Sequence, residues 1–195
     1  MKSLKESVVT AMDGSDGALF PFLPRIFGDF WELGTVPSAV IGLVRRHKSP
    51  CARLNLLDLG CGKGAVTVKA AHELGCRCLG IDAVAEFIRE ARRRARAYGV
   101  ERRCRFRTGD IRREIRRLRN FDVILCGSIG PVFGDYRATL SALLPALNPA
   151  GIIIIDDGYF DEESGFAHPR AGKKSVILAQ AGRAGCRLVD ERITP

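Results

Sequence analysis

The sequence predicts an α/β fold, a doubly wound and mostly parallel sheet flanked by helices, with a helical cap at the N-terminus. Three observations predict it. From Leu54 onward, short runs rich in aliphatic residues alternate with runs at helical spacing. A glycine-rich stretch, LGCGKG, separates the first strand-like run from the helical run that follows. Residues 1–50 lack this alternation, so we expect them to form a cap or lid and residues 51–195 to form one folding unit.

Length and composition indicate a single globular domain. A chain of 195 residues can bury a substantial core, and 46% apolar with 27% charged residues is typical of soluble proteins. No apolar run approaches the roughly 18 residues that span a bilayer, and the N-terminus has no secretory signal pattern. We expect a cytoplasmic protein without a membrane partner; the sequence does not predict its oligomeric state.

The seven cysteines are odd in number, and most lie in apolar stretches. We interpret them as reduced, buried thiols. Cys76 and Cys78 are separated by one residue, with no second pair or nearby histidine to complete a tetrahedral set. No metal site is therefore expected.

The periodicity of the apolar residues predicts the order of the elements. In the first half of the chain we expect a helix over 37–47, a strand over 54–57, a helix over 64–74, a strand over 78–81 and a helix over 87–98. In the second half we expect a strand over 104–107, a short helix over 111–118, a strand over 121–126, a helix ending at 147, a strand over 151–155, a loop over 156–172, a helix over 173–184 and a sixth strand over 187–193. The four isoleucines of 152–155 predict a central strand that is buried on both faces.

The chemistry is expected where the strands end. Gly60, Gly62 and Gly64 allow a tight turn at the start of a helix, where backbone N–H groups face a ligand. The same loop also satisfies the dinucleotide pattern G-x-G-x-x-G/A, and Asp82 lies at about the right distance to bind a ribose. A nicotinamide-dependent oxidoreductase is therefore one alternative.

Three carboxylates distinguish the alternatives. Asp58, Asp82 and Asp110 follow three strands that we expect to be neighbours. Two like charges some 4 Å apart cost about 4 kcal/mol at an effective dielectric constant of 20, so these groups would repel a pyrophosphate. S-adenosylmethionine carries a sulfonium and an ammonium, and its ribose and adenine offer donors to carboxylates. The three acids therefore favour this cationic cofactor.

These motifs carry a resemblance to a known family. The segment LLDLGCGKG resembles the D-x-G-x-G-x-G signature of the class I, Rossmann-like, S-adenosylmethionine-dependent methyltransferases. Asp82 in LGIDAVAEFI, Asp110 in RTGDI and the ending of 143–151 match further features of that family. The family usually closes its sheet with a seventh, antiparallel strand, whereas this chain ends directly after the expected sixth one, so we expect the seventh strand to be missing.

The resemblance implies a role for each matching residue. Asp58 and the backbone of 60–62 would lie near the methionine moiety, Asp82 would bind the ribose, and Asp110 would lie near adenine N6. The complete predicted cofactor-binding set is Asp58, Gly60, Cys61, Gly62, Gly64, Asp82, Ala83, Gly109, Asp110, Ile111, Cys126 and Gly127.

The sequence gives fewer indications of the residues that bind the methyl acceptor. Methyl transfer from a sulfonium mainly needs an aligned nucleophile, so the sequence assigns no catalytic residue. Asp156, Asp157 and Tyr159 are candidates because they follow the fifth strand, with a solvated strand end as the alternative. Trp31 is either an anchor of the N-terminal helices or part of a lid over the cofactor.

The charge is concentrated in one stretch. The range Arg89–Arg119 holds fourteen arginines and four acids, a net charge of +10 in a chain of +9. This basic face is consistent with RNA binding, but only two aromatic residues interleave with it. We therefore predict an enzyme that transfers a methyl group from S-adenosylmethionine to a small molecule. The alternatives are an RNA methyltransferase that uses the basic face and a non-catalytic module that binds S-adenosylmethionine.

Overall fold

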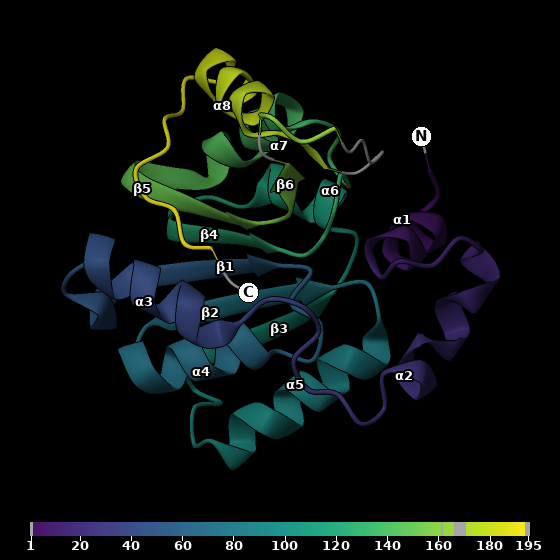
Figure 1. The fold of residues 1–195 in the computed structure, drawn as a ribbon. Helices are drawn as coiled ribbons and strands as arrows, with labels where there is room; N and C mark the ends of the chain where they lie inside the picture. Colours follow the sequence, from purple (N-terminus) through teal and green to yellow (C-terminus); the bar gives the residue numbers. More distant parts are fainter. Residues whose placement is uncertain (1, 161, 166–170, 194–195) are drawn as a thin grey trace.

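The computed structural model describes residues 2–160, 162–165 and 171–193 and contains a five-stranded parallel sheet (Figure 1). Its strands are β1 (Asn55–Leu59), β2 (Arg77–Asp82), β3 (Cys104–Thr108), β4 (Phe121–Gly127) and β5 (Leu147–Asp156). They run in the order β3-β2-β1-β4-β5, and every neighbouring pair is parallel. The predicted α/β, Rossmann-like fold class is therefore confirmed.

Helices cover both faces of this sheet (Figure 1). One face carries α3 (Pro37–His47), α4 (Ala65–Leu74) and α5 (Ala85–Ala97). The other face carries α6 (Ile111–Glu114), α7 (Tyr136–Leu143) and the 3-10 turns Ile115–Arg117 and Leu144–Ala146, while α8 (Lys174–Arg183) packs on α7.

Successive side chains along each strand point to opposite faces of the sheet, and they contribute to the hydrophobic core on each face. Leu56 packs into the core under α3, α4 and α5, and the next residue, Leu57, packs into the core under α6 and α7. Successive crossovers diverge to either side of β1, so a crevice opens beyond the carboxyl ends of β1 and β4. The register of the strands therefore brings the predicted site residues to one edge.

The N-terminal cap contains more helix than predicted. The sequence predicted a helical cap but, before residue 37, did not predict its individual helices, which are α1 (Leu4–Ala11), the 3-10 helix Gly17–Phe22 and α2 (Leu23–Ile26). The signal for α1 is a capping box, in which the Ser3 hydroxyl accepts from the N–H of Glu6 and the Glu6 carboxylate accepts from the N–H of Ser3. Val9, at 1% exposure, packs with Phe87 of α5 and fixes the cap on the domain.

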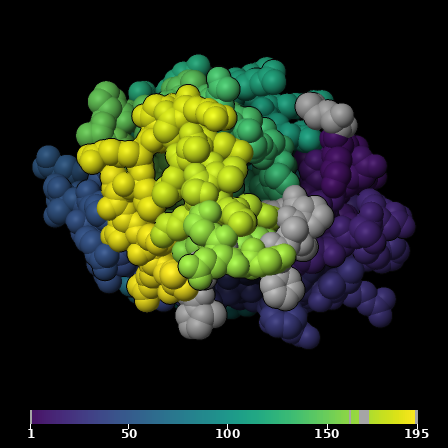
Figure 2. Space-filling model, turned by 45° about the horizontal axis from the view of Figure 1, so that its top comes forward, coloured from purple at the N-terminus to yellow at the C-terminus, as the bar shows by residue number. Residues whose placement is uncertain are grey.

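The predicted sixth strand over 187–193 is wrong. This segment has no secondary structure, and it runs against α3, where the Asp190 carboxylate pairs with Arg46 and His47. Figure 2 shows the C-terminal residues, in yellow, passing beside the blue α3. Leu188 is 52% exposed, so the apolar pattern of the segment does not form a sheet face.

The predicted position of β5 is wrong as well. Because the C-terminal segment does not pair with the sheet, β5 is its last strand in the part of the chain described. Only Ile154 of its four isoleucines is buried, and the others are partly exposed. A run of four isoleucines thus indicates a strand but does not fix its place in the sheet.

Smaller differences concern the segments around β5. The helix expected to end at 147 ends at Leu143, and β5 already begins at Leu147, with an irregular register near the left-handed Ala150. The expected loop contains β6 (Tyr159–Phe160), which pairs with β7 (Gly172–Lys173). All seven cysteines are free, and five of them are buried. No helix among the described residues is long and apolar enough to cross a membrane.

Candidate functional site

A cavity of about 430 Å³ lies at the carboxyl ends of β1, β2 and β4. Seven of the predicted cofactor residues line it: Gly60, Gly62, Asp82, Ala83, Gly109, Ile111 and Gly127. The cap supplies the facing wall, with residues of α1 and the side chains of Phe27, Phe30 and Leu33. Its volume lies within the range of about 300–1,000 Å³ that is typical of small-molecule sites.

The glycine loop requires its glycines for two different reasons. Gly60 has φ +75°, and a Cβ there would lie 2.4 Å from Cγ2 of Ile129, so only glycine leaves the cavity floor open. Gly64 has φ +76°, and its Cβ position is filled by Ala91 and Phe106. Gly64 therefore permits close packing of the loop on α5 and does not line the cavity.

Asp82 joins the loop to the end of β2. Its carboxylate accepts from the N–H of Gly62 at 2.9 Å and from the N–H of Val84 at 2.8 Å, and the residue is only 6% exposed. Burial raises the pKa of Asp82, while these hydrogen bonds act in the opposite direction. Each carboxylate oxygen retains acceptor capacity toward the cavity, which suits ligand hydroxyl donors.

Asp58 lies deeper than Asp82. It is 3% exposed and lines a small cavity of about 30 Å³ that shares Gly60, Gly62 and Gly127 with the main one. Desolvation raises the pKa of Asp58 to about 6, and the hydrogen bond from the Thr67 hydroxyl, at 2.6 Å, offsets part of that rise. A cationic group in the small cavity would stabilise the ionised carboxylate.

Asp110 does not line the main cavity, although its neighbours Gly109 and Ile111 do. Its carboxylate is held by Arg112, with Nε 2.9 Å from Oδ1 and Nη2 2.8 Å from Oδ2. The Arg112 side chain and N–H lower the pKa of Asp110. Oδ1 also caps α6 by accepting from the N–H of Arg112.

The two predicted cysteines are buried in the protein interior. The Cys61 thiol belongs to the core under α3, α4 and α5, and Cys61 lines only the small cavity. Cys126 is 1% exposed in β4, and burial raises its pKa to about 12. Neither residue lines the main cavity, but Cys126 lines the second cavity described below.

Trp31 anchors the cap. Its Nε1 donates to the carbonyl of Lys63 at 3.0 Å, and its ring is flanked by the cationic groups of Lys69 and Arg94 at 5.1 and 4.9 Å. Lys63 Nζ in turn donates to three carbonyl groups of the cap, one of them that of Phe30. Trp31 does not line the main cavity, although it lines the small cavity at Asp58, and its contacts with Lys63, Lys69 and Arg94 support the anchor interpretation.

A second cavity, of about 340 Å³, adjoins the first, and Ile129 lines both. Asp156 and Asp157 line this second cavity, whereas Tyr159 does not and instead packs under Lys174. Sequence reasoning missed Tyr136, the first residue of α7. Its hydroxyl donates to Oδ2 of Asp157 at 3.1 Å, and burial raises its pKa.

Sequence reasoning also missed Ser128, which lines the main cavity and contacts Asp156 of the second cavity. It follows β4 with φ +52°, an unfavourable conformation for a residue other than glycine. Its hydroxyl lies 3.3 Å from the hydroxyl of Thr35 and 3.5 Å from Oδ2 of Asp156. A serine directly after a strand carries no distinctive sequence signal, so only the fold reveals its position.

The basic face is partly neutralised. Glu90 pairs with Arg93 and Arg94, and Glu114 pairs with Arg107. Its arginines up to Arg107 lie along α5 and β3, at the edge of the sheet opposite β5, whereas those from Arg112 to Arg119 lie on or after α6, on the face of the sheet that carries α7. Four strand spacings separate β3 from β5, about 19 Å at about 4.8 Å each.

The chain is similar to several known proteins. Residues 52–180 match the family described as methyltransferase domain. The uncharacterized protein YjhP of Escherichia coli (strain K12) is 32% identical over 122 residues, which cover 63% of this chain and 48% of that protein. The chain thus spans about half the length of this relative.

Two solved structures share the fold. One is a SAM-dependent methyltransferase from Thiobacillus denitrificans in complex with S-adenosyl-L-homocysteine, with a TM-score of 0.70 and 23% identity over 87% of this chain and 72% of that chain. The other is a SAM-dependent methyltransferase from Geobacter sulfurreducens in complex with the same compound, with a TM-score of 0.72 and 22% identity over 85% of this chain and 70% of that chain.

Proposed function

Because the chain belongs to the methyltransferase-domain family, we propose that it binds S-adenosylmethionine in the main cavity and transfers the methyl group to a small molecule in the second cavity. This match confirms the methyltransferase family predicted from the sequence. The proposal rests chiefly on one observation, that the two cavities adjoin at Ile129 beyond the end of β4.

The main cavity fits the chemistry of this cofactor. Asp82 offers free acceptor capacity to ribose hydroxyls, and Gly60 lets the ligand approach the loop backbone. The small cavity at Asp58 supplies an acceptor for the ammonium group of the methionine moiety. When bound, the cofactor supplies an electrophilic methyl group on a sulfonium.

The chain's own residues have three tasks in this reaction. The cap excludes water from the main cavity, because α1 and Leu33 form its outer wall. The backbone after β4, held by the N–H of Ser128 on the carbonyl of Asp156 at 3.0 Å, shapes the passage between the two cavities. The side chains of the second cavity orient the acceptor so that its nucleophile faces this passage.

Asp157 is the group best placed to assist the acceptor. Its carboxylate lines the second cavity, and the hydroxyl of Tyr136 fixes its orientation. A nucleophile that loses a proton during transfer can pass it to such a carboxylate. Tyr136 then acts as a positioning residue for Asp157.

The basic face supports an RNA acceptor less well. The part of this face on α5 and β3 is remote from the second cavity, which lies beside β4 and β5, three and four strand spacings from β3, or about 14 and 19 Å at about 4.8 Å each. Among the residues that the structure describes, no arginine or lysine lines the second cavity, although Asp135, Asp156 and Asp157 do. This charge disfavours a phosphate-rich acceptor at the transfer position.

A thermal-shift comparison tests the cofactor half of the proposal. S-adenosylhomocysteine should raise the melting temperature of the wild type, whereas NADH and ATP should not, and Asp82→Ala should reduce the shift. Glu101→Ala, which removes an exposed carboxylate at the turn before β3, is the matched control and should respond like the wild type. If NADH stabilised the protein and S-adenosylhomocysteine did not, the proposal would be refuted and a nicotinamide-dependent oxidoreductase would be favoured.

A transfer assay tests the acceptor half. With labelled S-adenosylmethionine, the label should pass to the small-molecule fraction of a cell extract and not to its RNA fraction. Asp157→Asn should lower this transfer without weakening the binding of S-adenosylhomocysteine. Label in RNA would support the alternative acceptor, and binding without any transfer would support the non-catalytic module.

A further inference from the structure

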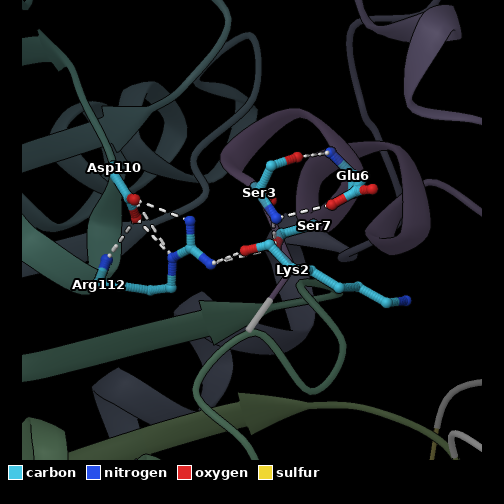
Figure 3. Close-up of polar contacts among 6 residues, drawn as sticks. All are labelled: Lys2, Ser3, Glu6, Ser7, Asp110 and Arg112. Carbon is cyan, nitrogen blue, oxygen red and sulfur yellow. Dashed lines mark hydrogen bonds and ion pairs between the residues drawn. The ribbon is translucent and has the colours of Figure 1, made fainter.

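Arg112 connects the end of β3 with the N-terminal helix (Figure 3). On one side, Nε and Nη2 of its guanidinium donate to the carboxylate of Asp110. On the other side, Nη1 donates to the carbonyl of Lys2 at 3.0 Å and to the hydroxyl of Ser7 at 3.2 Å. The side chains of Arg112 and Asp110 are only 15% and 12% exposed, so water screens the pair weakly. One side chain thus joins two segments more than one hundred positions apart.

The helix that Arg112 holds is a wall of the main cavity. Five residues of α1 or its C-terminal cap line that cavity: Leu4, Ser7, Val8, Ala11 and Met12. Within α1 only Val9 is fully buried, and a helix of eight residues is marginal without tertiary contacts. Displacing α1 would therefore open the cavity to water.

Arg112 also controls the carboxylate of Asp110. The planar guanidinium engages both carboxylate oxygens, a geometry that fixes the direction of the remaining lone pairs. The flanking residues Gly109 and Ile111 line the cavity, so Asp110 stands at that end of it.

We infer that Arg112 is a positioning residue that couples closure of α1 to occupancy of the adenine end of the main cavity. The inference rests on the proposed function, because it requires an S-adenosylmethionine-type ligand in that cavity. A ligand in the cavity contacts α1 and the residues on either side of Asp110, and the Asp110–Arg112 fork joins these two walls by holding the backbone of Lys2 and the hydroxyl of Ser7. Ligand binding and closure of α1 therefore favour each other.

Lysine cannot replace this arginine. The fork needs two nitrogen donors toward Asp110 and a third toward α1 in one plane, and an ammonium group provides a single point charge without that geometry. Arg112→Lys should thus keep the charge yet lose the coupling. The Arg112→Lys variant therefore distinguishes an effect of guanidinium geometry from an effect of positive charge alone.

The test compares Arg112→Gln and Arg112→Lys with Arg113→Gln, which removes an exposed charge on the same helix α6. Two quantities are measured with S-adenosylhomocysteine as the probe: its dissociation rate and the hydrogen exchange of residues 4–11. In the wild type and in Arg113→Gln, the probe should slow exchange in α1. In both Arg112 variants, dissociation should be about tenfold faster or more, and α1 should no longer respond to the probe.

A milder variant tests the same contact with less risk of disrupting the fold. Ser7→Ala removes one contact between Arg112 and α1 but leaves the Asp110–Arg112 fork in place. It should weaken the protection of α1 by the probe while the melting temperature without ligand stays near that of the wild type.

The outcomes are distinguishable. If the wild type binds the probe but the Arg112 variants match it within twofold in dissociation rate and α1 exchange, this inference is overturned and the proposed function stands. If the wild type does not bind the probe at all, the proposed function is overturned and the inference falls with it.

Discussion

Replacing Asp58 by asparagine should stabilise the ligand-free protein at alkaline pH. Asp58 is buried, and its pKa of about 6 exceeds the ordinary value of 3.8, so the folded state disfavours its ionised form. The amide of asparagine carries no charge to desolvate, and its oxygen can still accept from Thr67. The same substitution removes the acceptor that we propose for the ammonium group of the cofactor.

The size of the effect follows from the pKa shift. A rise from 3.8 to about 6 corresponds to about 3 kcal/mol of lost stability when the carboxylate is ionised. Because the folded pKa lies above the unfolded one, the folded protein binds more protons between these values. The penalty is therefore absent below about pH 4, grows as the pH rises through about 6, and is complete at pH 8.

Urea denaturation of the wild type and of Asp58→Asn at pH 8 and pH 5 measures this penalty. The stability advantage of the variant should be larger at pH 8 than at pH 5 by about 1–2 kcal/mol, because all other groups titrate alike in both proteins. In parallel, the affinity of the wild type for S-adenosylhomocysteine should fall as the pH drops below about 6, whereas the weak affinity of the variant should not. An equal advantage at both pH values would refute the reasoning.

Three further predictions concern the loop, the second cavity and the basic face. Gly60→Ala should lower the free energy of unfolding by about 1–3 kcal/mol, measured by urea denaturation, because the new methyl group meets Ile129 at 2.4 Å and φ is positive. Tyr136→Phe should lower kcat/KM about tenfold in the transfer assay while calorimetric binding of S-adenosylhomocysteine stays unchanged, because only the orientation of Asp157 is lost. Arg96→Gln should leave small-molecule methylation within twofold of the wild type, since Arg96 lies on the face remote from the second cavity; a larger loss would speak for an acceptor bound on that face.

The strand ends could be predicted because they depend on local pattern. Period-two and period-3.6 repeats fix where β1 and β2 end, and parallel pairing then brings Asp58 and Asp82 to one edge. The glycine loop could be predicted for the same reason, since it needs positive φ in consecutive turns at Gly60 and Gly62.

Features that depend on tertiary pairing could not be predicted. The apolar residues of 187–193 are compatible with a strand, but Asp190 pairs with α3, a choice that no periodicity encodes. Asp110 does follow β3, as its strand predicted, but its carboxylate is bound by Arg112. Arg112 also binds the backbone of Lys2, so this arrangement depends on where the N-terminal segment lies, which the local sequence does not encode. Tyr136 carries no motif, and only the fold places it beside Asp157.

Isothermal titration of the wild type and Asp82→Ala with S-adenosylhomocysteine tests the central claim most directly. The wild type should bind at one site, and the variant at least about tenfold more weakly, because Asp82 both holds the loop at Gly62 and offers acceptors to the ribose. Equal affinity of the two proteins, or binding of NADH in place of S-adenosylhomocysteine, would contradict a methyl-donor site at the end of β2.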